Sequence, residues 1–522
     1  MRISSKKTRQ DFAGAYAFGK PPIQPGKPKE TSTRTPNRAN SYENTKRAQY
    51  LRIKPDMDAA VAEVFETQGF VGGPNIAKLE KSIESYLGAG AAIACASGTD
   101  ALRLSLKALG IGPGDEVVTT PFTFFATAGA IANVGAKPVF ADIRPGCFTI
   151  DPDCIEPLVT PRTKAIVPVH LYGQCADMEA VHAIAARHGL AVLEDAAQAL
   201  GAQRHGRPAC TLAPMAAISF YPTKNLGGAG DGGMVIAQDA ALAERVRLLR
   251  AHGAGTTYIH TIVGTNSRLD ALQAAVLNVK LAHLDEWNSE RRARAAYYTE
   301  RFSEIPEVAV PVERPGNFHV YHQYVIRLPR RDEARELFRA RGVGCAVFYP
   351  LPLHLQECFR YLGYSERDCP HAVQASREVL ALPMYPELAP DQQDEVVALV
   401  KEHVAGKPVL SSLAARRDIG RREMRARAAV VFALAMLGLG CLSDVHDRRP
   451  FTREWRNEIE HDRAFLERRA RIDKKDPEKL KADGGAIGRD RTDGPPLIGK
   501  PQGIAADVDV QGNAVVRYGV RW

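Results

Sequence analysis

The stretch ISFYPTKNLGGAGDGGMVIA, residues 218–237, places one lysine between two apolar segments. Residues 218–221 have the composition of a strand end, and the glycines that follow Lys224 let the backbone pass close to a bulky group. Most lysines lie on the protein surface in contact with water, and an ordinary surface position is one interpretation of Lys224. Partial burial in such a turn would instead disfavour the ammonium form and leave a nucleophilic amine. A lysine that forms a Schiff base needs this property.

The composition indicates a soluble globular protein. The chain has 522 residues, of which 45% are hydrophobic and 25% charged, enough for two or more domains with a sizeable core. The net charge is +9, but residues 1–54 alone hold 13 Lys and Arg against 3 Asp and Glu. The rest of the chain is therefore close to neutral. Because a nucleic-acid-binding domain carries its positive charge on the folded part, we expect no nucleic-acid face.

The nine cysteines are scattered, with no C-x-x-C pair and no zinc spacing. We therefore expect no metal site. Unpaired cysteines in a chain of this length are typical of a reducing cytoplasm. No apolar segment follows the basic start of the chain, so we expect no export from the first methionine and a cytoplasmic catalytic part.

The chain changes character near residues 47, 286 and 405. Residues 1–46 are basic and poor in aliphatic side chains, which predicts a disordered arm. From 47 to 285, buried-type strands alternate with helical segments, one of which stops at Gly189. This alternation predicts a mostly parallel sheet with helices on both faces. The predicted strands are residues 91–96, 116–120, 137–142, 164–170, 191–195, 216–220 and 232–237.

Residues 286–404 predict a smaller α+β domain. The segments 322–328 and 342–354 have strand-like composition, and the helical pattern DEARELFRARG separates them.

Polar residues follow several predicted strands of the large domain. Because ligands bind at the carboxyl ends of strands in open α/β sheets, these residues are candidates for a site. Ser-Gly-Thr at 97–99 begins a helix and offers backbone N–H groups to an anion, although it is also an ordinary helix start. Asp195 ends a strand, where it could equally cap a helix. Phe124 or Phe125 could lie on a planar ring, or both could belong to the core.

Together these groups match the needs of pyridoxal phosphate. The cofactor requires an amine for its aldehyde, a carboxylate for its pyridine nitrogen, an anion cradle for its phosphate and a flat partner for its ring. The sequence offers each of them.

The motifs also carry a family resemblance. In this order they resemble the sugar aminotransferases of the DegT/DnrJ/EryC1/StrS family, over about residues 47–404. The resemblance implies a fold-type I aminotransferase, α/β in class, that uses pyridoxal phosphate. Such enzymes are commonly homodimers that move an amino group, often from glutamate, onto a nucleotide-linked keto sugar. The motifs are GPNIAKLE, SGTDAL, GPGDEVVTTPFTFFAT, TPRTKAIVPVHLYG, EDAAQALGA, SFYPTKNLGGAGDGG, GTNSRLDALQAA and YPLPLH.

The resemblance assigns roles to individual residues. Lys224 resembles the Schiff-base lysine and the base that moves the substrate proton, and Asp195 the partner of the pyridine nitrogen. The remaining positions are cofactor or substrate contacts: Gln198 against the cofactor ring, Gly98, Thr99 and Ser219 in the phosphate cradle, Phe124 stacked on the ring, Asn266 reaching the phosphate from the neighbouring subunit, and Tyr349 and His354 near the sugar.

Two other functions are open alternatives. A dehydratase of the same family carries histidine at the lysine position, and a non-catalytic sugar-sensing regulator would lack the lysine or the aspartate. Lys224 and Asp195 argue against both. Within the aminotransferases, the motifs TPRTKAIVPVHLYG and DAAQALGA resemble relatives that act on 3-keto rather than 4-keto sugars. Such products serve amino-sugar biosynthesis for surface polysaccharides or glycosylated metabolites.

Residues 405–522 lie outside the family pattern. Residues 424–441 run from two arginines through an apolar segment to Cys441 and resemble a bacterial lipoprotein signal. The segment is short for a membrane span, so it leaves open a packed helix, a membrane tether, or a fused or misread second reading frame. We expect flexible chain beyond residue 477 and a hairpin that turns at 511–513.

Overall fold

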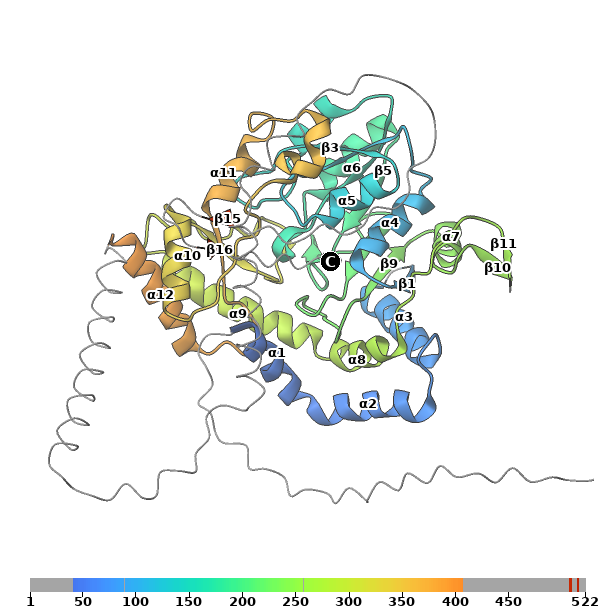
Figure 1. Cartoon of the computed structure of the whole chain (residues 1–522), viewed down its shortest axis with the longest axis horizontal. Coiled ribbons are helices and arrows are strands. Elements are labelled where there is room, and N and C mark those ends of the chain that lie inside the picture. The colour runs from blue at the N-terminus through green and yellow to red at the C-terminus, as the bar shows by residue number, and fades with distance from the viewer. Residues whose placement is uncertain (1–40, 89, 257, 407–506, 509–513, 516–522) are drawn as a thin grey trace, which may run out of the picture. The chain divides into compact units, whose positions relative to one another are not determined.

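The protein is described by a computed structural model covering residues 41–88, 90–256, 258–406, 507–508 and 514–515 (Figure 1). The chain divides into two compact units, Met1–Arg416 and Arg417–Trp522. The second unit contributes strands β15 (Asp507–Val508) and β16 (Ala514–Val515), which pair antiparallel as the expected hairpin requires. The turn of that hairpin and the segment 424–441 lie outside the described residues. Among the described residues, no helix is long and apolar enough to cross a membrane.

A seven-stranded sheet forms the centre of the first unit, in the order β1-β9-β8-β5-β4-β2-β3. Strand β9 pairs antiparallel with β1 and with β8, and the pairings from β8 to β3 are parallel. The mostly parallel sheet predicted from the alternating pattern is confirmed. Its strands are β1 (Ala91–Cys95), β2 (Glu116–Thr119), β3 (Lys137–Phe140), β4 (Thr163–Val167), β5 (Ala191–Asp195), β8 (Met215–Ser219) and β9 (Gly233–Ala237).

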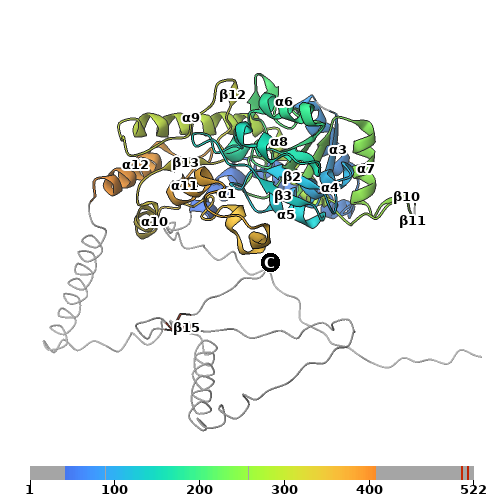
Figure 2. The same ribbon diagram turned by 90° about the horizontal axis from the view of Figure 1, so that it is seen from above.

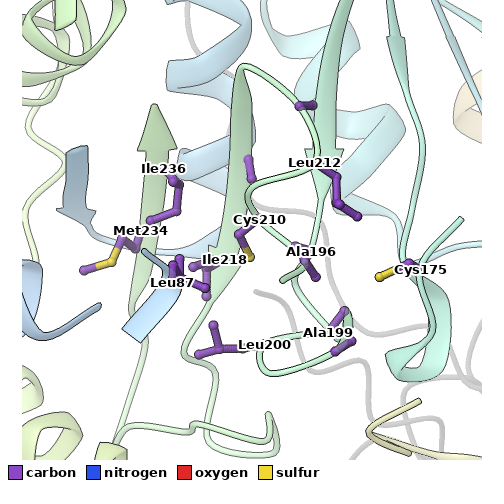
Figure 3. Packing of buried hydrophobic residues seen from close by; sticks show 14 of the residues in the cluster. Leu87, Cys175, Ala196, Ala199, Leu200, Cys210, Leu212, Ile218, Met234 and Ile236 are labelled. Carbon is purple, nitrogen blue, oxygen red and sulfur yellow. The ribbon is translucent and has the colours of Figure 1, made fainter. Parts of the chain in front are cut away.

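Helices cover both faces of this sheet (Figures 1 and 2). Successive strand residues point to opposite faces, so Ala92 and Ala94 join one buried cluster while Ile93 and Cys95 join the other. Figure 3 shows part of the first cluster, where Met234 and Ile236 of β9 and Ile218 of β8 lie together. The helices of the first face are α3 (Pro74–Leu87), α6 (Met178–His188) and α8 (Ala271–Leu281); those of the second are α4 (Gly98–Ala108), α5 (Ala126–Asn133) and α7 (Ala240–Arg250).

Local signals set the ends of these helices. Ser97 caps α4 by accepting a hydrogen bond from the N–H of Asp100, at 3.1 Å between Oγ and N. Asp177 caps α6 in the same way, and Gly189 ends that helix in the left-handed conformation, as predicted.

A second set of elements follows α9 (Leu284–Phe302) and has a hydrophobic core of its own. It comprises β13 (Tyr324–Arg327), α10 (Arg331–Ala340), β14 (Val379–Leu382) and α12 (Pro390–Val404). Helix α11 (Pro370–Glu378) packs instead in a cluster with Phe122 and Phe140 of the large domain. The strand-like segment 342–354 makes only an isolated bridge between Ala346 and Ala381, and β14 takes the place beside β13. The prolines of that segment lack the N–H that a strand ladder needs.

Two helices precede α3 at the start of the described chain, α1 (Ser41–Arg52) and α2 (Lys54–Thr67). Helix α1 begins inside the segment assigned to the disordered arm, whose residues 1–40 lie outside the described residues. Helix α2 contacts α8. The first unit also contains short strands: β6 (Gln203–Arg204), β7 (Arg207–Pro208), β10 (Ala254–Thr256), β11 (Ile259–His260) and β12 (Asn317–Phe318). Its 3-10 helices are η1 (Pro152–Cys154), η2 (Glu156–Leu158), η3 (Leu171–Gly173), η4 (Leu353–Leu355) and η5 (Glu357–Leu362).

Candidate active site

The carboxyl ends of β1 and β8 meet at the start of α4. A Cβ atom added to Gly98 would lie 2.6 Å from the Cβ and 3.0 Å from the Oγ of Ser219. Position 98 therefore admits only glycine without a shift, and the first turn of α4 lies directly against the end of β8. Thr99 is exposed beside them. The three residues predicted to form a phosphate cradle lie together, with the N–H groups of a helix start among them.

Asp195 ends β5 and is buried, with 4% of its surface exposed. Its Oδ2 accepts a hydrogen bond from the Thr127 hydroxyl at 2.8 Å, and its Oδ1 accepts one from the N–H of Ala197 at 3.2 Å. Burial raises the pKa of Asp195, whereas these two donors and the charge of Lys224 oppose the rise. The carboxylate is thus held rigidly in a dry place, where a facing cation would be strongly stabilised.

Lys224 lies in the turn after β8 and is partly buried. Burial lowers its pKa to about 8, and the charge of Asp195 opposes this shift. The two side chains are therefore within electrostatic reach of each other. The turn is tight: Lys224 donates its N–H to the carbonyl of Tyr221 at 2.8 Å, and a Cβ on Gly227 would lie 2.6 Å from the carbonyl oxygen of Pro222.

The residue after the lysine anchors this turn. Asn225 is buried, and its Nδ2 donates to Oδ1 of Asn288 in α9 at 2.7 Å. Its Oδ1 pairs with Nδ1 of His322 at 3.1 Å. Burial, and next the charge of Lys224, lower the pKa of His322 well below its ordinary range. The sequence pattern did not single out these anchors, because their partners are far away along the chain.

Gln198 joins two tyrosines. Its Oε1 accepts the N–H of Tyr172 at 2.7 Å, and its Nε2 donates to the hydroxyl of Tyr349 at 3.3 Å. The Tyr172 hydroxyl donates to the carbonyl of Phe348. Gln198 and Tyr349, both predicted at the site, are thus brought together by Tyr172, which sequence reasoning missed. Its backbone φ of 59° was not visible from the sequence pattern.

Phe124 and Phe125 have different surroundings. The Phe125 ring stacks on that of Phe359, with centroids 5.8 Å apart. Phe124 has 58% of its surface exposed, so of the two it is the one with a free face for another ring. Tyr221, beside Lys224, is also exposed and was not predicted as a site residue.

The last two predicted site residues are Asn266 and His354. Asn266 is exposed, and its neighbour Ser267 donates a hydrogen bond to Asp100 in the first turn of α4. His354 is 1% exposed, and its ring lies 6.4 Å from the ring of Phe140 and 6.1 Å from that of Tyr364. Burial lowers its pKa. Neither of its ring nitrogens has a hydrogen-bond partner among the described residues.

The arrangement fits pyridoxal phosphate. The amine of Lys224 lies within reach of the charge of Asp195, the contact of Gly98 with Ser219 shapes a narrow cradle at a helix start, and Phe124 offers an aromatic face. Among the described residues, no cluster of His, Cys, Asp and Glu could hold a metal ion.

Comparisons with known proteins identify relatives of the whole chain. The chain is 52% identical over 356 residues to a "pleiotropic regulatory protein" of Geobacillus stearothermophilus, covering 68% of this chain and 96% of that protein. It is 41% identical to a UDP-N-acetyl-3-dehydro-α-D-glucosamine 3-aminotransferase of Acidithiobacillus ferrooxidans, covering 69% of this chain and 97% of that enzyme.

Solved structures share the fold. The crystal structure of Streptomyces venezuelae DesV superimposes with a TM-score of 0.68 at 42% identity, covering 70% of this chain and 98% of DesV. That of Bacillus subtilis NtdA with bound pyridoxamine phosphate gives a TM-score of 0.63 at 33% identity, covering 68% of this chain and 82% of NtdA. The model of the DegT/DnrJ/EryC1/StrS aminotransferase family matches residues 52–401. The chain therefore belongs to the DegT/DnrJ/EryC1/StrS aminotransferase family.

Proposed function

We propose that the protein is a pyridoxal-phosphate-dependent aminotransferase that moves an amino group from an amino acid, commonly glutamate, onto a nucleotide-linked keto sugar. One observation supports this more than any other. Lys224 has its pKa lowered to about 8 and lies within electrostatic reach of the buried carboxylate of Asp195. Strongly perturbed ionisable groups of this kind cluster at catalytic sites.

The residues that would hold the cofactor are those gathered at the strand ends. Gly98, Thr99 and Ser219 would bind its phosphate, and Phe124 and Gln198 would flank its ring. When bound, pyridoxal phosphate supplies an aldehyde carbon for amines and a cationic ring that withdraws electrons from the α-carbon of the substrate. Asp195 would keep that ring protonated, because a buried carboxylate with two fixed donors stabilises a facing cation.

Lys224 would serve as the general acid and base. With a pKa of about 8, a substantial fraction of its Nζ is neutral near pH 7 to 8, where it can take a proton from the α-carbon of the amino donor. The same nitrogen can return a proton when the keto sugar is aminated. The hydrogen bonds of the turn around Lys224 and Asn225 fix the backbone from which the lysine side chain projects, so one amine would be available to both half reactions.

The substrate class is inferred from relatives. The similarity to an enzyme named for amination at a 3-dehydro sugar supports the preference for 3-keto nucleotide sugars. Tyr349 and His354 are proposed near the sugar. The partly buried Tyr349 has its pKa raised by burial, so its hydroxyl stays protonated and can donate a hydrogen bond to a sugar oxygen.

A regulatory role is the second candidate, because a 52% identical relative is named as a pleiotropic regulator. A protein that only senses a sugar needs no amine with a lowered pKa beside a buried carboxylate. Lys224 also speaks against a dehydratase with histidine at that position. We therefore favour the aminotransferase.

A homodimer is proposed to complete the site. Tyr258 is 91% exposed, and Ile259 and Val263 near it are also exposed apolar side chains in the segment that leads to Asn266. Such a cluster favours contact with another chain. In the proposed dimer, Asn266 reaches the phosphate bound by the neighbouring subunit.

Mixing two inactive variants tests the shared site. Lys224→Ala and Asn266→Ala proteins, unfolded and refolded together, form mixed dimers in which one of two sites has both residues, so activity should return to about a quarter of the wild-type value. Recovery is not expected if Asn266 serves the subunit that carries it.

The central experiment follows the cofactor and the product. Purified protein should be yellow, lose this colour with glutamate, and become covalently labelled at Lys224 after borohydride treatment, as located by peptide mass spectrometry. A panel of keto sugar nucleotides should then yield one aminated product. Lys224→Ala should fold normally and not turn over. Wild-type turnover in that variant would refute the proposed function.

A further inference from the structure

Behind the proposed site lies a second pair of ionisable side chains. Glu194 and His170 are both fully buried, and the His170 Nε2 lies 2.9 Å from an Oε2 of Glu194. Neither residue has a part in the chemistry proposed above. A buried carboxylate is costly unless its oxygens are fully hydrogen-bonded, so its presence requires an account.

The pair is fully satisfied and its proton is fixed. Oε2 of Glu194 accepts the N–H of Cys210 at 2.8 Å, and Oε1 accepts the N–H of Ala213 at 2.7 Å. Nδ1 of His170 accepts the N–H of Ala176 at 3.1 Å. Because that nitrogen accepts, the proton of the imidazole lies on Nε2 and is donated to Glu194. One pair thus joins strand β5 to two loops, 170–176 and 210–213.

Glu194 directly precedes Asp195 in β5, so their side chains point to opposite faces of the sheet. The backbone of Asp195 is held on both sides: its N–H donates to the carbonyl of Pro168 at 2.9 Å, and its carbonyl accepts the N–H of His170 at 3.0 Å. His170 therefore holds Asp195 through its backbone and Glu194 through its ring. Figure 3 shows Cys175 and Cys210, one from each loop, in the same buried cluster as Ala196 and Ala199.

Loop 170–176 reaches the other side of the site as well. Its Tyr172 gives a backbone N–H to Gln198 and a hydroxyl hydrogen bond to the carbonyl of Phe348, and Gln198 in turn binds Tyr349. The His170 ring closes this loop at Ala176. A displacement of the ring would therefore be passed to Gln198 and Tyr349 by hydrogen bonds.

We propose that Glu194 and His170 are positioning residues that hold Asp195 and Gln198 in register with the cofactor. This inference rests on the proposed function. The pair acts on the geometry of the site from the opposite face of the sheet and touches neither the cofactor nor the substrate.

Two substitutions of His170 separate its two bonds. The side-chain oxygen of His170→Asn can replace Nδ1 and still accept from Ala176, but it loses the donor to Glu194. The amide of His170→Gln can replace Nε2 and still donate to Glu194, but it releases Ala176. Glu194→Gln places an amide group where the carboxylate accepts three hydrogen bonds. His182→Gln is the matched control, because His182 in α6 binds the carbonyl of Leu212 in the same loop 210–213 but contacts neither Asp195 nor loop 170–176.

Each full-length protein is compared with the wild type in three measurements, at a temperature at which all are folded by circular dichroism. These are the dissociation constant of pyridoxal phosphate for the apo protein, the rate at which glutamate bleaches the bound cofactor, and the thermal midpoint. Glu194→Gln and His170→Asn should weaken cofactor binding and slow bleaching by about tenfold or more, because small displacements of catalytic groups cost that much. His170→Gln, the mildest change, should slow bleaching while leaving cofactor binding within about threefold of wild type. His182→Gln can likewise keep a donor at the position of Nε2, and it should leave cofactor binding and bleaching as in the wild type.

Variants that lose thermal stability while binding cofactor and reacting as the wild type does would overturn the inference. So would a variant series in which His182→Gln matches Glu194→Gln in all three measurements. A failure of the proposed function looks different, because the wild type itself would then neither bind pyridoxal phosphate nor be bleached by glutamate.

Discussion

Replacing Lys224 with methionine should stabilise the apo protein near neutral pH. The side chains are similar in volume, but methionine removes an amine that burial holds in an unfavourable surrounding. In the apo protein the lysine has no cofactor to bind. The unfolded chain, by contrast, leaves it in water with its ordinary pKa.

The size and sign follow from the shift in pKa. The pKa of Lys224 falls from 10.5 in the unfolded chain to about 8 in the folded protein. Below pH 8, the folded state must bury a charge or give up a proton that the unfolded state keeps. The free energy of unfolding of the wild type therefore rises with pH between about 8 and 10.5. The cost at pH 7 is about 3 kcal/mol as an upper bound, which the partial exposure of the side chain reduces.

Urea unfolding of apo wild type and Lys224→Met at a series of pH values measures this difference. Cofactor is first removed from the wild type with hydroxylamine. The variant should be more stable at pH 7, and its advantage should shrink as the pH rises from 8 to 10.5. Lys81→Met, on an exposed position of α3, controls for the change of residue type. An advantage that does not vary with pH, or a wild type that is the more stable protein at pH 7, would refute the reasoning.

Three further substitutions address the rest of the site. Thr127→Val removes a hydrogen-bond donor that favours the ionised form of Asp195, so the pKa of Asp195 should rise further. The acidic limb of the pH profile of activity should then move to higher pH, by an amount worth about 1.5–3 kcal/mol. An unchanged profile would contradict this. Gly98→Ala forces a methyl group against the end of β8, so it should lower the free energy of unfolding in urea by about 1–3 kcal/mol and remove most of the cofactor affinity. The control Gly146→Ala, at a glycine with open space around it, should change neither quantity. Phe124→Ala should leave the free energy of unfolding within about 0.5 kcal/mol of wild type, because the ring is exposed. It should weaken the binding of pyridoxal phosphate, measured by fluorescence titration, by about two- to tenfold. Equal affinity would exclude a stacking role for Phe124.

Much of the fold followed from local patterns. The continuous apolar runs predicted the seven strands of the central sheet within a few residues, because strands buried on both faces need apolar side chains at every position. The small domain was harder. The segment 342–354 has strand-like composition, yet β14 pairs with β13 instead, and only long-range packing decides between them.

The residues of the site also fall into those that the sequence could predict and those that it could not. Lys224, Asp195 and Gly98 lie at or just after the carboxyl ends of strands. Ligands bind at these ends in open α/β sheets, so the sequence pattern could identify the three residues as candidates. Thr127 and Tyr172 act through hydrogen bonds to residues far along the chain. Nothing in their own neighbourhoods marks such a contact.

One arginine sets a limit on how far this enzyme can be shortened. The guanidinium of Arg52 meets Glu286 and Glu290 on α9 at 2.5 and 2.8 Å, and Glu387 beyond β14 at 3.4 Å. These carboxylates lie 234 to 335 positions further along the chain. A gene trimmed to the start of the family match at residue 52 would keep Arg52 but remove the rest of helix α1, which positions the arginine. Engineered fragments should accordingly begin upstream of Ser41.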